Sequence, residues 1–217
     1  MHYCRMNKLE SAIIFAVEKH AGAVRKGSEL PYIIHPLEAL TIASGITDDQ
    51  EVLAAVVLHD VVEDTQTTLE DIESIFGKRI ADLVASHTED KMPGIPASES
   101  WEHRKQTTIQ SLQNASLDEK IIVLSDKLSN IRAKSRDVAR DGDDMWKKFN
   151  QKDKKMHEWY YRSITDALSE LSETLAYQEL VHLIDRVFDE SGLPEEQPEI
   201  PGDYPSPADL IREDRER

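Results

Sequence analysis

Apolar residues recur at helical spacing along most of the chain. Within residues 8–21, Leu9, Ile13 and Val17 recur every four positions and therefore share one face of a helix. The stretch LEDIESIFG follows threonines that can cap a helix, and it ends on a glycine that can stop one. Residues 117–136 contain the strongly apolar run IIVLSDKLSNIRA. This pattern predicts a chain built from amphipathic helices.

Breakers and caps divide the rest of the chain into further helices. Pro36 suits the first position of a helix, and Gly45 suits a helix end. Asp48 or Asp49 can cap the next helix, which is expected to run to about Glu63. Helices are also predicted over residues 78–87, over WEHRKQTTIQSLQNA and, once or twice, within residues 153–188, with DKMPGIPASES as a loop. No alternating strand pattern competes, so the predicted fold class is all-α.

The composition changes near the C-terminus. Five of the nine prolines, with many acidic residues, lie from residue 189 onward. Such a segment buries too little apolar surface to fold independently. We therefore predict one domain over residues 1–188 and an acidic, proline-rich tail over residues 189–217.

The overall charge limits the classes of ligand that the chain is expected to bind. With 42 acidic against 26 basic residues, the formal net charge is −16. Sequence-independent binding of nucleic acid needs a broad basic surface, so no nucleic-acid partner is expected. Binding of a small anionic ligand is still possible, provided that a metal ion and a few basic side chains create a local positive site.

Cysteine usage and hydropathy point to a cytoplasmic protein. The single cysteine, Cys4, excludes an internal disulfide framework and a thiolate zinc site, and we interpret it as inert. No apolar run of about 18 residues is present, so no membrane span is expected. The N-terminal stretch MHYCRMNKLE has no hydrophobic signal core.

The stretch AAVVLHDVVEDT, residues 54–65, places four titratable side chains at the end of an apolar run. On one continuous helix, His59 shares a face with Glu63, and Asp60 shares a face with Asp64. Two layers of polar side chains would result, one turn apart. Taken alone, Glu63 and Asp64 are also typical of a solvated helix end.

Two other segments place a polar residue beside apolar ones. His35 follows Tyr-Ile-Ile, and Asp126 follows Ile-Ile-Val-Leu-Ser. An isolated histidine in such a place is usually a hydrogen-bonded core residue, and Asp126 could pair with Lys127 or Arg132. Together with His59 and Asp60, however, they could supply a mixed nitrogen and oxygen ligand set for a divalent metal ion, with room for water.

The segments RKGSELPYIIHP, LHDVVEDT and LSDKLSNIR together resemble the HD superfamily of metal-dependent phosphohydrolases. Within it they resemble the alarmone hydrolases of the RelA/SpoT group, over roughly residues 8–170. The resemblance implies an HD-domain helical bundle that holds one metal ion, usually Mn²⁺. It assigns the metal to His35, His59, Asp60 and Asp126, catalysis to Glu63 and Asp64, and substrate binding to Arg25, Lys26 and Asn130.

The implied activity is that of a guanosine-3′,5′-bis(diphosphate) 3′-pyrophosphohydrolase of the stringent response. Such an enzyme converts (p)ppGpp to GDP or GTP plus pyrophosphate. The segment HTEDKMPGIPASESWEHRK differs from the long bifunctional enzymes of the group, which leaves guanine against adenine preference open. The alternatives are an HD-type nucleotidase, an NADPH phosphatase, or an antitoxin that degrades the product of a toxic alarmone synthetase. A toxin partner and a homo-oligomer stay open.

The other aromatic and histidine residues are expected to have structural roles or to be exposed. Trp101, Trp146, Trp159, Tyr160 and Tyr161 are expected to lie in the core or at helix contacts. The histidines outside the predicted ligand set, expected to be structural or exposed, are His20, His87, His103, His157 and His182.

Overall fold

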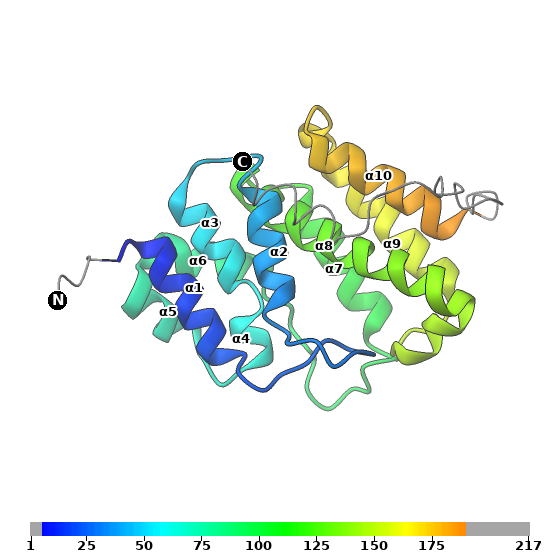
Figure 1. The fold of residues 1–217 in the computed structure, drawn as a ribbon, viewed down its shortest axis with the longest axis horizontal. Helices are drawn as coiled ribbons and strands as arrows, with labels where there is room; N and C mark the ends of the chain where they lie inside the picture. Colours follow the sequence, from blue (N-terminus) through cyan, green and yellow to red (C-terminus); the bar gives the residue numbers. More distant parts are fainter. Residues whose placement is uncertain (1–5, 190–217) are drawn as a thin grey trace, which may run out of the picture.

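The computed structural model describes residues 6–189, so Cys4 and residues 190–217 of the predicted tail lie outside the described range. In chain order its helices are α1 (Lys8–Lys19), α2 (Ile34–Ala43), α3 (Gln50–Leu58), α4 (Val61–Asp64), α5 (Leu69–Phe76), α6 (Lys78–His87), α7 (Trp101–Leu112), α8 (Leu117–Asp141), η1 (Gly142–Lys148), α9 (Lys154–Ala167), η2 (Ser169–Leu171) and α10 (Leu175–Phe188). No β-strand forms within this range, and the predicted all-α fold class is confirmed (Figure 1).

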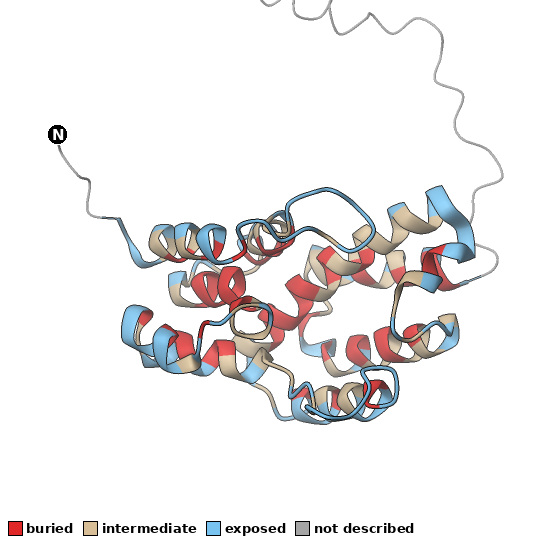
Figure 2. Ribbon diagram, turned by 90° about the horizontal axis from the view of Figure 1, so that it is seen from below, coloured by how far each residue is buried: buried red, intermediate tan, exposed pale blue. Residues whose placement is uncertain are grey.

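Helix α8 is the central element of the bundle. It packs against α2, α3, α6 and α10, so the N-terminal and C-terminal helices meet on it (Figure 1). Its inward face is apolar and includes Leu124, Leu128 and Ile131, each fully buried. The buried positions gather along the middle of the molecule, where the helices face one another (Figure 2). Any polar residue on this face of α8 is therefore held in the core.

Local signals in the sequence set most helix ends. Thr68 caps α5 by accepting the backbone N–H of Asp71, whose side chain accepts the N–H of Thr68 in return. Gly77 ends α5 with φ of 96°, a conformation that residues with a Cβ rarely adopt. Asp49 caps α3 through the N–H groups of the first turn. These caps match the predicted positions.

The predicted single helix ending near Glu63 is wrong, because it breaks at His59 and Asp60. Helix α3 ends at Leu58, and the short α4 begins two residues after the histidine. The Nδ1 atom of His59 lies 2.6 Å from the carbonyl oxygen of Val56. That oxygen would accept the N–H of Asp60 in a continuous helix. The imidazole thus replaces one helical hydrogen bond and turns the chain.

Smaller differences concern helix faces and ends. Val17, expected on the buried face of α1, is 44% exposed, whereas Ala16, expected on that face as well, is buried together with Ala12. Helix α2 begins at Ile34, so Pro36 occupies its third position rather than its first. Large side chains are excluded where α1 packs closely on α3, which explains why alanines fill that contact.

The C-terminal half encloses a cluster of aromatic rings. Trp146 stacks on Phe188 with ring centroids 5.6 Å apart and also contacts His157. Trp101 meets His157 and Tyr160 edge to face. The expected packing role of these aromatic residues is confirmed, and this cluster fixes α7 and α9 against each other.

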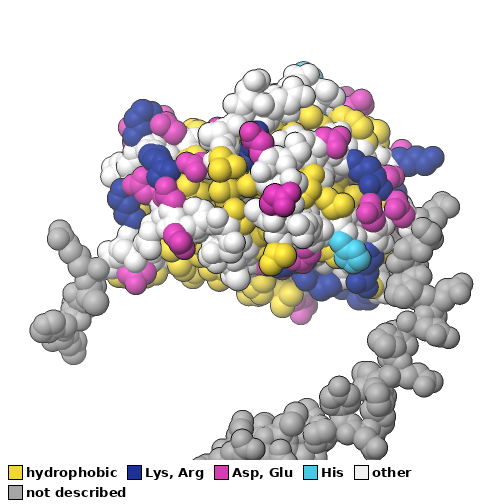
Figure 3. Space-filling model, turned by 90° about the horizontal axis from the view of Figure 1, so that it is seen from above, with side chains coloured by type: hydrophobic (Ala, Val, Ile, Leu, Met, Phe, Trp, Pro, Cys, Tyr) yellow, Lys and Arg dark blue, Asp and Glu magenta, His cyan; other side chains and the backbone are white. Residues whose placement is uncertain are grey.

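Charged side chains are interspersed on the surface. Figure 3 shows acidic and basic groups side by side on one face rather than in separate patches. Arg79, for example, bridges Asp49, Glu51 and Asp118, which ties α6 to the starts of α3 and α8. No helix of the described residues is both long and apolar enough to cross a bilayer.

Leu124→Ala tests the central role of α8. Loss of a fully buried leucine leaves a cavity and should lower the free energy of unfolding by about 2–5 kcal/mol. Leu175→Ala makes the same chemical change at a position that is 83% exposed, and it should change that energy by less than about 0.5 kcal/mol. Urea denaturation followed by circular dichroism measures both, and equal losses would contradict this packing.

Candidate active site

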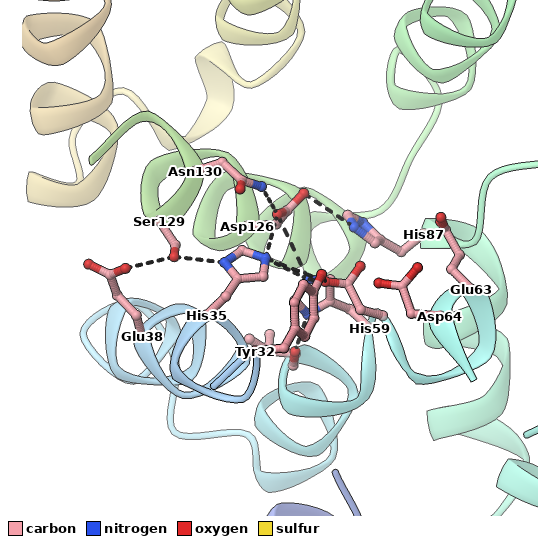
Figure 4. Close-up of polar contacts among 12 residues, drawn as sticks. Tyr32, His35, Glu38, His59, Glu63, Asp64, His87, Asp126, Ser129 and Asn130 are labelled. Atoms are coloured by element: carbon pink, nitrogen blue, oxygen red, sulfur yellow. Dashed lines mark hydrogen bonds and ion pairs between the residues drawn. The ribbon is translucent and has the colours of Figure 1, made fainter. Parts of the chain in front are cut away.

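Three distant segments bring four polar side chains together in the core. His35 comes from the first turn of α2, His59 and Asp60 from the turn between α3 and α4, and Asp126 from the middle of α8. Figure 4 shows His35, His59 and Asp126 pointing toward one another. His35 and Asp126 are buried and His59 is fully buried.

Most separations between neighbouring donor atoms are close to those of ligands around one metal ion. The Nε2 atoms of His35 and His59 are 3.3 Å apart, and that of His59 is 3.0 Å from Asp60 Oδ2. Asp126 Oδ1 lies 3.1 Å from His35 Nε2 and 3.8 Å from His59 Nε2. Two ligands at about 2.1 Å from an ion lie about 3.0 Å apart at a right angle and about 3.4 Å apart at the tetrahedral angle.

The hydrogen bonds of His35 and His59 leave one nitrogen of each neutral ring free to accept. His59 Nδ1 faces the Val56 carbonyl, which can only accept, so Nδ1 carries the hydrogen. The Ser129 hydroxyl donates to Glu38 at 2.8 Å and therefore accepts from His35 Nδ1, also at 2.8 Å. In the neutral rings both Nε2 atoms are then lone pairs that face each other.

A positive charge is needed among these acceptors. Burial disfavours the charged imidazole of His59, but the Asp60 and Asp126 carboxylates outweigh burial and raise its pKa to about 9. Burial works against charge on Asp126 as well, yet Lys127 and His35 hold its pKa well below the ordinary value. A divalent cation would meet the same demand without a proton. The donor set therefore fits a divalent metal ion.

A second layer of contacts orients the carboxylates. The Tyr32 hydroxyl donates to Asp60 Oδ2. Lys127 Nζ lies 2.6 Å from Asp126 Oδ2, and the Asn130 amide donates to Asp126 Oδ1. Asp126 thus pairs with Lys127, one of the two partners considered from the sequence, whereas Arg132 pairs with Glu38 and Glu179.

Glu63 and Asp64 lie on α4, next to the loop that joins α6 to α7. The backbone N–H of Glu89 donates to Glu63 Oε1 at 2.7 Å, and burial raises the pKa of Glu63. Lys91 pairs with Asp64 at 3.1 Å. Glu63 lines the adjoining cavity, whereas Asp64 does not. The loop therefore fixes Glu63 at the edge of the site.

A cavity of about 480 Å³ opens beside the donor set, within the size range of small-molecule sites. The basic or aromatic side chains that line it include Arg104, Lys105, Lys127 and Tyr160. Arg104 and Lys105 both pair with Glu89. Basic side chains thus line the cavity together with acidic ones, which are Asp60, Glu63, Glu89, Asp90, Glu119 and Asp126.

The three predicted substrate-binding residues take different positions. Asn130 lines the cavity, and its Oδ1 accepts from Arg25 Nη2 at 3.3 Å. Arg25 also lies over the ring of Tyr32, 5.7 Å from its centroid. Lys26 is exposed and lies over Phe149, at 5.6 Å. Arg25 and Asn130 are therefore brought together, and Lys26 lies outside this contact.

Sequence reasoning missed three residues of the site. Tyr32 stands three positions before His35 in the quoted motif, and Ser129 stands three positions after Asp126, but neither spacing alone reveals a role. His87, expected to be structural or exposed, lies within 3.4 Å of Asp126, and burial lowers its pKa. No motif in the sequence marks this last residue.

The fold and the donor set define the class of protein. The family model of the HD domain matches residues 12–154, which is more than half of the chain. The chain therefore belongs to the HD domain family.

Named relatives make the similarity more specific. The chain is 39% identical over 131 residues to the guanosine-3′,5′-bis(diphosphate) 3′-pyrophosphohydrolase MESH1 of Danio rerio, covering 59% of this chain and 69% of the relative. It is 41% identical over 133 residues to the Homo sapiens protein of that name, covering 59% and 70%.

A solved structure supports the same grouping. It is that of a metazoan ortholog of SpoT that hydrolyses ppGpp and plays a role in starvation responses. The TM-score is 0.67 at 27% identity, over 87% of this chain and 98% of that chain. The similarity thus extends beyond the sequence match to most of the helical bundle.

Ser129→Ala tests the orientation of His35. Without the hydroxyl, His35 Nδ1 loses its acceptor, and metal affinity should fall about 10–100-fold, as is typical when a ligand loses its hydrogen-bond partner. Ser125→Ala is the matched control, because Ser125 is equally buried on α8 but donates to the helix's own Ile121 carbonyl. Calorimetric titration with Mn²⁺ measures both affinities. Equal affinities for the two variants would rule out this role of Ser129.

Proposed function

We propose that the chain is a metal-dependent 3′-pyrophosphohydrolase of guanosine alarmones, with (p)ppGpp as substrate. The observation that carries the proposal is the convergence of buried acceptors from three segments beside a cavity with basic side chains. The activity for which the relatives are named supports the substrate class. The site residues, and Mn²⁺ as the ion, are part of the proposal.

His35, His59, Asp60 and Asp126 would hold the ion. When bound, it would polarise a phosphoryl oxygen and lower the pKa of water toward neutrality. Carboxylate ligands suit Mn²⁺, whereas imidazole ligands suit later ions as well.

The hydrolytic step adds one water across the bond between phosphorus and the 3′ oxygen. The water oxygen bonds to phosphorus, the bond to the 3′ oxygen breaks, and pyrophosphate leaves GDP or GTP behind. Glu63, held by the Glu89 N–H, would orient the water and accept its proton. Asp64, one position along α4, would assist in returning a proton to the 3′ oxygen.

The nucleotide would extend from the donor set toward Asn130 and Arg25. The Arg25 guanidinium is the wider, planar group and suits stacking on a purine base. Lys26 would supply charge for a phosphate farther out. The cavity side chains Lys105 and Lys127 would offset the negative charge of the substrate.

Several expectations stay predictions from the sequence. They are the domain boundary at residue 188 and a cytoplasmic location, while the preference for guanine or adenine, a toxic synthetase as partner and a homo-oligomer stay open. The alternatives of an NADPH phosphatase or a nucleotidase keep the same metal site and differ in the product released.

Glu63→Gln separates catalysis from metal binding. Glutamine can still accept the Glu89 N–H but cannot take a proton, so turnover of ppGpp should fall about 10²–10⁴-fold while Mn²⁺ affinity is retained. Glu70→Gln, at an exposed position on α5, serves as the control and should keep full turnover. Full activity of Glu63→Gln would remove this residue from the mechanism.

A substrate panel tests the reaction itself. The purified full chain with Mn²⁺ is incubated with ppGpp, ppApp, NADPH and deoxynucleoside triphosphates, and the products are separated by ion-exchange chromatography. Pyrophosphate and GDP should form from ppGpp, and a chelator should abolish the reaction. Phosphate released from NADPH alone would favour the phosphatase, and chelator-resistant turnover would contradict the metal role.

A further inference from the structure

His87 is a partly buried imidazole beside the donor set, and the proposed reaction does not use it. It is the last residue of α6, and its side chain is only 9% exposed. Figure 4 shows His35 and His87 on either side of Asp126. Asp126 faces His35 with Oδ1 and His87 with Oδ2.

The contact between His87 and Asp126 is too long for an ordinary hydrogen bond. His87 Nε2 lies 3.4 Å from Asp126 Oδ2, outside the usual range of about 2.7–3.2 Å. The same oxygen already accepts from Lys127 at 2.6 Å. No shorter polar contact to the His87 ring is present within residues 6–189. The ring also lines the adjoining cavity, where a further partner can reach it.

The His87 ring lies beside part of the proposed metal set. Donor atoms of His59, Asp60 and His87 all lie within 4.8 Å of one another, and those of His35, His59 and Asp126 form a second such group that shares His59. The ring of His59 stands nearly perpendicular to both neighbours, with centroids 5.1 Å from His35 and 5.0 Å from His87. The 3.4 Å separation from Asp126 Oδ2 is also short enough for two ligands of one ion.

We propose that His87 is a fifth protein ligand of the divalent ion, completing a set of three imidazoles and two carboxylates. The inference rests on the proposed role of the other four residues. Water or a phosphoryl oxygen would bind the ion beside these five donors. Because imidazole suits later first-row ions better than carboxylate does, His87 would raise the preference for Co²⁺ or Ni²⁺ over Mn²⁺.

Counting coordinated imidazoles tests the inference without relying on activity. Pulsed electron paramagnetic resonance on the Mn²⁺-loaded full chain should detect three imidazole nitrogens in the wild type and two in His87→Gln and His87→Ala. His182→Ala removes an exposed imidazole from α10 and should leave the count at three. Two coordinated imidazoles in the wild type would overturn the inference, whether or not any variant folds.

Metal affinity distinguishes a ligand from a positioning residue. His87→Gln and His87→Ala should lower Co²⁺ affinity at least about 100-fold, beyond the 10–100-fold range of lost outer partners, and Mn²⁺ affinity by a smaller factor. Glutamine can donate a hydrogen bond to Asp126, so recovery of affinity in His87→Gln alone would instead make His87 a positioning residue and refute ligation.

His59→Ala separates failure of this inference from failure of the proposed function. Loss of metal binding in His59→Ala with unchanged binding in both His87 variants would overturn only the fifth ligand. Wild-type binding in His59→Ala would overturn the four-residue metal site itself, and with it the proposed reaction. Circular dichroism of each variant confirms that the helical fold is retained.

Discussion

The structure depends on a cluster of hydrogen-bond acceptors in its core that needs a positive charge among them. The lone pairs of His35 and His59 face each other and two carboxylates, while the outer nitrogens of both rings are already committed to Ser129 and to a backbone carbonyl. Buried acceptors without donors are costly unless a cation or a proton joins them. The packing of α2, α3 and α8 holds this arrangement in place. The same acceptors form one wall of the adjoining cavity and supply its proposed metal ligands.

The break between α3 and α4 links the packing to the site. The His59 ring takes over the carbonyl of Val56, which ends the helix and swings Asp60 toward His35. After the break, Glu63 on α4 faces the loop that follows α6, and the Glu89 N–H of that loop donates to its carboxylate. One side-chain contact therefore sets both the donor geometry and the position of the proposed base.

Much of the fold follows from local signals, and these were predictable. Thr68, Asp49 and Gly77 act through neighbours within four residues, so their roles can be deduced from the chain itself. The break at His59 was not predictable, because a ring-to-carbonyl contact overrides the helical period. Ser129 and His87 acquire their surroundings only when α8 meets α2 and α6, and no spacing in the sequence records that packing.

The most direct test is a crystal structure of the full chain grown with Mn²⁺, with anomalous scattering recorded to locate the ion. The account predicts one strong peak in the core, about 2.0–2.3 Å from nitrogen atoms of His35 and His59 and from oxygen atoms of Asp60 and Asp126. A peak elsewhere, or these four side chains turned away from a common point, would contradict it.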